Sequence, residues 1–150
     1  MPRIEFTHAK QVQLFGEELF ERVRAGSRPL TAGFLTVHLC GVLVFARFLG
    51  DEEHDKANGC VGLSLLMGKT LFKNTSKNLS REIPGSQPGA VRAGDYVVSF
   101  NGSGSSSTLD ENFAVALCVA LGWLSAEPAK DMLRKARKRE LDGADDYFID

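Results

Sequence analysis

The most restrictive feature of the sequence is an apolar stretch over residues 31–48 that is rich in β-branched and aromatic side chains. Such residues favour extended backbone. We expect a hairpin, with a strand at about residues 33–38, a turn at 39–41 and a second strand at 42–48. Arg47 is the one charged residue of the stretch. So apolar a hairpin must be covered on both faces, by helices or by another subunit.

A second informative segment begins with the β-favouring residues 96–100. The glycines at 102 and 104 then end the predicted strand, because glycine tolerates backbone conformations that close a turn. A threonine and a glutamate with capping-box spacing predict a helix over residues 108–124. This helix is apolar nearly all round, so we expect it in the interior or at a subunit contact.

Hydrophobic periodicity predicts a first helix over residues 8–24. A segment at 57–72, rich in leucine, is also predicted as a helix, although its glycines disfavour that conformation. The prolines and glycines of residues 80–94 predict a loop. A final basic helix opens at Glu127-Pro128, with an acidic tail after it.

Composition bounds the class of protein. The 150 residues are 43% hydrophobic and 25% charged, which predicts a single globular domain over residues 1–150. The net charge of −1 argues against nucleic-acid and membrane partners. We find no membrane-span pattern and no signal peptide. Three cysteines without paired spacing indicate a reducing compartment, so we expect a cytoplasmic protein.

The turn at Gly102 and Gly104 is a candidate ligand site. Free backbone N–H groups at a strand-to-helix junction can bind a phosphate or a carboxylate. Asp110 and Glu111, however, lie in the first turn of the predicted helix and would repel a second anion. The alternative is therefore a well-capped turn that holds no ligand.

Four charged residues stand where predicted elements begin or end, which is where functional groups tend to lie: Arg47, Lys69, Asp110 and Glu111. The two cations could bind a carboxylate or a haem propionate. The alternative is that the four residues pair with one another across the rim of the sheet. Glu111 is a candidate general base for an enzyme acting on a small organic acid, provided that burial raises its pKa.

His38 and His54 are candidate ligands for haem iron. The competing interpretation is a core histidine at position 38 and an exposed one at position 54. The motif of a phosphate-binding loop, the paired cysteines of a zinc site and the nucleophile elbow of a hydrolase are all missing from the sequence. No metal site is therefore predicted apart from these two haem-ligand candidates.

Three segments together resemble one protein family. Residues 37–50 (VHLCGVLVFARFLG) resemble the hairpin of the GlcG/HbpS-like family, also called the haem-degrading-domain family, which includes the C-terminal domain of PduO. Residues 68–79 (GKTLFKNTSKNL) resemble the family's lysine-bearing helix. Residues 97–122 (VVSFNGSGSSSTLDENFAVALCVALG) are similar to its last strand, small-residue turn, Asp-Glu pair and alanine-rich helix. The likeness spans about residues 8–125 and leaves the charged segment 126–150 outside.

The resemblance implies an α/β (α+β) fold of the profilin-like type, with a central antiparallel sheet flanked by helices, and assembly into homo-oligomers. Some members bind or degrade haem. By motif position, Arg47, Lys69, Asp110 and Glu111 correspond to family positions. The chain departs from the family in a hairpin turn one residue shorter and in the segment at 89–94. Haem or a related acidic compound is therefore the expected ligand, and a non-catalytic oligomeric module is the alternative.

Overall fold

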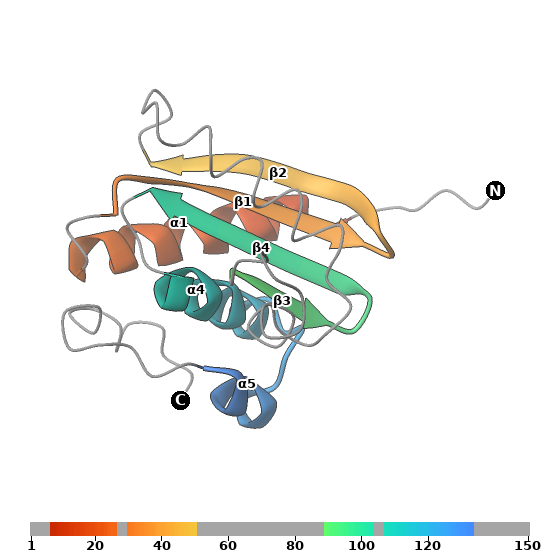
Figure 1. Cartoon of the computed structure of the whole chain (residues 1–150). Coiled ribbons are helices and arrows are strands. Elements are labelled where there is room, and N and C mark those ends of the chain that lie inside the picture. The colour runs from red at the N-terminus through yellow and green to blue at the C-terminus, as the bar shows by residue number, and fades with distance from the viewer. Residues whose placement is uncertain (1–6, 27–29, 51–88, 104–106, 134–150) are drawn as a thin grey trace, which may run out of the picture.

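The computed structural model describes residues 7–26, 30–50, 89–103 and 107–133. Within them the chain has an α+β fold, with an antiparallel sheet of strand order β2-β1-β4-β3 (Figure 1). The elements are α1 (Ala9–Gly26), β1 (Ala32–Leu39), β2 (Val42–Gly50), β3 (Ala90–Ala93), β4 (Tyr96–Ser103), α4 (Ser107–Ala120) and α5 (Ala126–Met132). The helix expected at 57–72 lies outside the described residues.

The predicted hairpin forms, and its turn explains its register. Leu39 pairs with Val42, so the loop consists of Cys40 and Gly41 alone. Both loop residues have positive φ, 50° at Cys40 and 80° at Gly41. Positive φ at both central positions is what a type I′ hairpin turn requires, because its twist matches that of the strands. A β-bulge between Val37 and His38 then shifts the pairing within the hairpin.

The expectation that this hairpin is covered on both faces is right for β1 and wrong for most of β2. Residues 32–38 of β1 are all buried, whereas β2 is mainly exposed or half-buried. Val42 and Leu43 are 48% and 44% exposed. The difference follows from strand order, since β1 lies between two strands and β2 is at the edge of the described sheet.

Two predictions for the second half of the chain need correction. Part of the loop expected at 80–94 is the short strand β3, which pairs with β4 through a turn at Gly94-Asp95. The strand expected to stop at residue 100 continues to Ser103, because Asn101, Gly102 and Ser103 pair with β1. Neighbouring strands supplied hydrogen-bond partners that outweighed the local turn preference of glycine.

Helices α1 and α4 cover the same face of the sheet. The ring of Phe100 on β4 packs edge-on against Phe20 of α1, with centroids 6.3 Å apart, and stacks on Phe113 of α4 at 4.0 Å. Helix α1 lies along β2, and α4 lies along β4 and β3 (Figure 1). Gly16 brings α1 close to the sheet, since a Cβ there would stand 3.0 Å from a methyl group of Leu35. This face holds the main hydrophobic core.

Helix α4 ends earlier than the predicted residue 124, for a reason visible at Gly122. This glycine has φ of 76°, and its N–H bonds to the carbonyl of Val119 at 3.0 Å. The next N–H, of Trp123, bonds to the carbonyl of Cys118 at 2.9 Å. These two bonds form a Schellman motif, which ends a helix by satisfying its last carbonyls. The chain then turns into α5, near the predicted start at Glu127-Pro128.

Candidate functional site

The structure separates the residues that the sequence singled out. Arg47 lies on β2, which packs against α1, whereas Asp110 and Glu111 lie on α4, which packs against β4 and β3. Helix α1 packs against both β2 and α4, so the arginine and the two acids lie on different elements of the helix-covered face. Lys69, His54 and Gly104 lie outside the described residues.

The backbone N–H of Gly102 already has a hydrogen-bond partner, the side-chain carboxylate of Asp110. Its N–H donates to Oδ1 of Asp110 across 3.0 Å. Asp110 is buried, so this charge-assisted bond ties the end of β4 to the first turn of α4. A phosphate or carboxylate at this amide would have to displace the aspartate. The contact favours the interpretation of the glycine turn as a structural junction.

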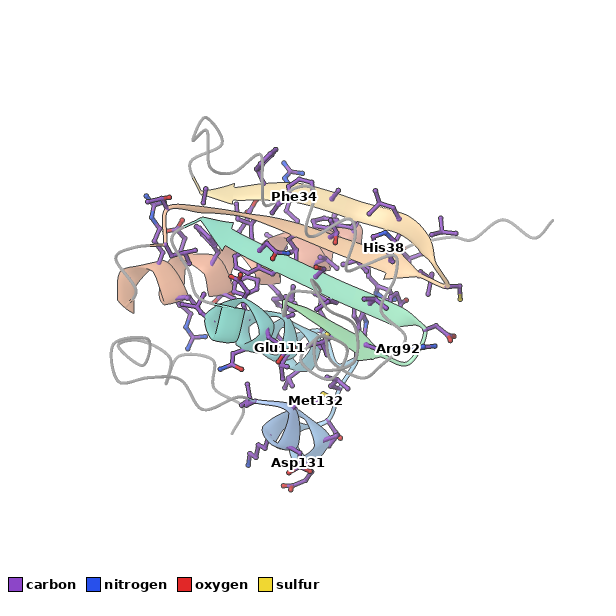
Figure 2. The ribbon with its side chains drawn as sticks, in the orientation of Figure 1. Phe34, His38, Arg92, Glu111, Asp131 and Met132 are labelled. Atoms are coloured by element: carbon purple, nitrogen blue, oxygen red, sulfur yellow. The ribbon has the colours of Figure 1, made fainter. Side chains whose placement is uncertain are left out.

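Glu111 is completely buried on α4. Its Oε2 atom has no hydrogen-bond partner among the described residues, although the residue takes part in other interactions. Figure 2 shows its position on α4. A buried carboxylate is the environment in which a general base is found. Reaction with a substrate would also require access, and the groove described next is not lined by Glu111.

A groove with a volume of about 410 Å³ lies between α1 and β2. Its buried lining residues are Phe20 and Leu49, and its charged residues are two glutamates and two arginines. The full lining is Glu17, Phe20, Glu21, Arg24, Arg47, Phe48, Leu49 and Gly50. The volume falls within the range of small-ligand sites, but the lining surface is more polar than apolar, whereas most such sites are predominantly apolar.

Gln13 holds one wall of this groove in place. Nη1 of Arg47 donates to Oε1 of Gln13 across 3.2 Å, and Nε2 of Gln13 donates to Oε1 of Glu17 across 3.2 Å. The amide thus connects a cation on β2 with an acid on α1. All three groups are at the surface, so the connection leaves the Arg47 guanidinium with further donors for a ligand.

Sequence reasoning found Arg47 but missed its neighbours on α1. The apolar periodicity of this helix predicts that Glu17, Glu21 and Arg24 lie on its solvated side. Their spacing of four and three residues does place them on one face, which was a usable signal. The sequence did not indicate that this face of α1 lies beside β2.

Among the described residues, His38, Cys40 and Cys118 lie on separate elements. His38 is buried on β1. Cys40 is exposed, whereas Cys118 is enclosed in α4, and desolvation by burial raises its pKa from 9.0 to about 12. The Cys118 thiol is therefore protonated and unreactive at neutral pH. Within the described ranges we find no group of three potential metal ligands and no helix long and apolar enough to cross a membrane.

Comparisons of the chain with protein-family models, with curated proteins and with solved structures found no match.

Proposed function

We propose that the protein binds a small organic acid in the groove between α1 and β2. The observation that carries the proposal is the presence of Arg24 and Arg47, from different elements, in the lining of one groove with a buried apolar base. Arginine binds carboxylates through paired N–H donors, which fixes the orientation of the ligand as well as adding affinity. Phe48 is the most exposed apolar residue of the lining and would contact the apolar part of the ligand.

The charges of the groove narrow the class of ligand. Glu17 and Glu21 balance the two arginines, so the lining has no net charge. A ligand with several carboxylates would be repelled by the glutamates, whereas one carboxylate with an apolar body is better matched. Haem is the ligand that the resemblance to the GlcG/HbpS-like family suggests. It carries two propionates, which the glutamates would repel, so a monocarboxylate is the better match to the groove.

Titration tests the proposal. Benzoate, succinate and hemin would each be added to the purified protein, with calorimetry for the acids and the Soret band for hemin. We expect saturable binding of benzoate and weaker binding of succinate. Replacing Arg47 or Arg24 by glutamine should weaken binding by about ten- to a hundredfold, because a hydrogen bond to a charged group contributes about 1.5–3 kcal/mol.

Arg92→Gln provides the matched control. Arg92 is an exposed arginine on β3, at the opposite edge of the described sheet, where it donates to the carbonyl of Gly94 across 3.1 Å. Its replacement should leave benzoate affinity unchanged. Equal losses in the variants of Arg92 and Arg47 would indicate nonspecific attraction. No saturable binding of benzoate, succinate or hemin would overturn the proposal.

A second candidate function is self-association without chemistry. Its supporting observation is the exposure of Val42 and Leu43 on β2, the outermost strand of the described sheet on that side. Exposed apolar edge strands pair readily with other chains. The proposal of an enzyme with Glu111 as its base has less support, since Glu111 lies away from the groove.

A further inference from the structure

The groove between α1 and β2 holds more charge than the binding of a monocarboxylate requires. Its two arginines account for the carboxylate of a ligand, whereas Glu17 and Glu21 line the same groove and oppose that carboxylate. A glutamate beside an anion-binding arginine weakens anion binding, unless the ligand also offers the glutamate a positive group. The two acids are therefore the part of the lining that a monocarboxylate leaves unexplained.

The bond between Arg47 and Gln13 identifies the acid nearest to this arginine. Gln13 precedes Glu17 by four residues and Glu21 by eight, so the three side chains follow one face of α1. One helical turn takes about 3.6 residues, which puts Glu17 one turn and Glu21 two turns from the residue that Arg47 contacts. Because α1 lies along β2 (Figure 1), the acids follow the arginine in succession along the groove.

The Gln13 amide already makes the pair of contacts that a zwitterion would make. Its oxygen accepts from Nη1 of Arg47, and its nitrogen donates to Oε1 of Glu17, each across 3.2 Å. The cation and the acid are thus one amide group apart. In an amide a single carbon joins the oxygen and the nitrogen, and in an α-amino acid two carbons join the carboxylate oxygen and the ammonium nitrogen. This spacing suits an α-amino acid better than a chain with its charges at opposite ends.

Both charged partners keep hydrogen-bonding capacity for a ligand beside Gln13. The amide takes up one of the five N–H donors of Arg47 and one of the two carboxylate oxygens of Glu17. Arg47, Glu17 and Glu21 are all exposed. A ligand can therefore reach them without any opening of the fold.

We infer that the ligand of this groove is an α-amino acid with an apolar side chain, bound as its zwitterion. The inference rests on the proposed function, from which the carboxylate and the apolar part are taken, and adds an ammonium group. The carboxylate binds Arg47 and the ammonium group donates to Glu17, while Glu21 adds to the negative potential beside it. A lining that is more polar than apolar matches such a ligand, because a zwitterion loses its solvation in an apolar site.

Two amino acids and their deaminated counterparts test the inference by calorimetric titration at about pH 7, where the amino group is charged. Phenylalanine is compared with 3-phenylpropanoate, and leucine with 4-methylpentanoate. The members of each pair differ in the ammonium group alone. We expect at least one amino acid to bind roughly tenfold more tightly than its counterpart, as a hydrogen bond between charged groups allows.

Glu17→Gln isolates the contact with the ammonium group. Glutamine keeps an oxygen that can accept from Gln13 and loses the charge. The affinity for the amino acid should fall roughly tenfold, to that of its counterpart, whose own affinity should stay the same or rise. Glu18→Gln is the matched control, since Glu18 is an exposed glutamate of the same helix outside the groove lining. It removes the same charge and should leave both affinities unchanged.

Several results would overturn the inference and leave the binding of a small acid in place. One is that benzoate or a deaminated acid binds at least as tightly as both amino acids, which would make Glu17 and Glu21 surface residues only. Another is amino-acid affinity that does not change in Glu17→Gln, or that falls equally in Glu18→Gln. The absence of saturable binding by benzoate and all four compounds would instead reject the proposed function together with the inference.

Discussion

Arg47 on the edge strand donates a hydrogen bond to Gln13 on α1 across 3.2 Å. The bond joins residues 34 positions apart in the sequence and sets one wall of the groove. Because Gln13 also donates to Glu17, the amide connects the guanidinium on β2 with a carboxylate on α1. This relationship defines the first variant to test.

Gln13→Glu should weaken benzoate binding several-fold. The new carboxylate would pair with Arg47 and compete with the ligand for its donors. The stability change should stay within about 1 kcal/mol, since surface ion pairs contribute little. Calorimetric titration and urea unfolding measure the two quantities. Gln11→Glu, an exposed position on the same helix, serves as the control and should retain full affinity. Unaltered affinity in Gln13→Glu would show that Arg47 does not meet the ligand.

Gly122→Ala should lower the free energy of unfolding by about 1 kcal/mol. The φ of 76° at this position favours glycine, and a Cβ there meets no atom within 4 Å, so the loss is purely conformational. Ser125→Ala is the matched control at the next helix start. Ser125 makes no side-chain capping bond, so its replacement should change stability by less than about 0.5 kcal/mol. Urea unfolding measures both free energies. An equal loss in Gly122→Ala and Ser125→Ala would argue against the Schellman motif.

Cys40→Asn should stabilise the protein by about 0.5–1 kcal/mol. Asparagine tolerates positive φ better than cysteine does, and Asn-Gly is the preferred pair in a type I′ turn. Gly41→Ala should destabilise the protein, because alanine is strained at a φ of 80°. Thermal unfolding monitored by circular dichroism measures both. A destabilised Cys40→Asn would mean that the thiol has a role beyond the turn.

The buried thiol of Cys118 predicts a loss of stability in alkaline solution. Its pKa is raised to about 12 in the folded chain, against 9.0 when exposed. Below pH 9 both states keep the proton, and between pH 9 and 12 only the unfolded state releases it. Stability therefore falls as pH rises, by up to about 1.4 kcal/mol per pH unit from this group.

Urea unfolding at pH 8, 9, 10 and 11 tests this, with Cys118→Ala as the reference that lacks the thiol. The difference in unfolding free energy between the two proteins should shrink as pH rises. A constant difference would contradict the burial of Cys118. Peptide mapping after treatment with a thiol reagent adds a second check, since Cys40 should react and Cys118 should not.

Leu43→Lys should abolish self-association, if the protein self-associates through β2. A lysine on an edge strand discourages pairing with another chain because its charge would be buried in the contact. Leu43 is 44% exposed, so the fold should tolerate the change. Light scattering over a wide concentration range measures the assembly state. Oligomers that persist in Leu43→Lys, or a wild-type protein that is monomeric throughout, would reject this interface.

Local chemistry determined much of the fold. The β-branched run at residues 31–48, the periodic apolar positions of the first helix and the turn at 39–41 act over a few residues, and they predicted the hairpin and α1, whereas β3 was expected as a loop. Gly122 carried an equally local signal for the end of α4, which a closer consideration of glycine would have found. The predicted profilin-like topology and family membership stay predictions.

Tertiary structure alone decided the sites. Strand order put Arg47 at one edge, beside Arg24 and away from Asp110, and no property of the isolated segments specifies that order. Packing of α1 against β2 brought Gln13 and Glu17 to Arg47, although the two segments are far apart in the chain. Sequence patterns indicate which backbone conformation each short segment of the chain prefers. Grooves arise from contacts between distant segments, where burial and hydrogen bonding of the whole sheet set the arrangement.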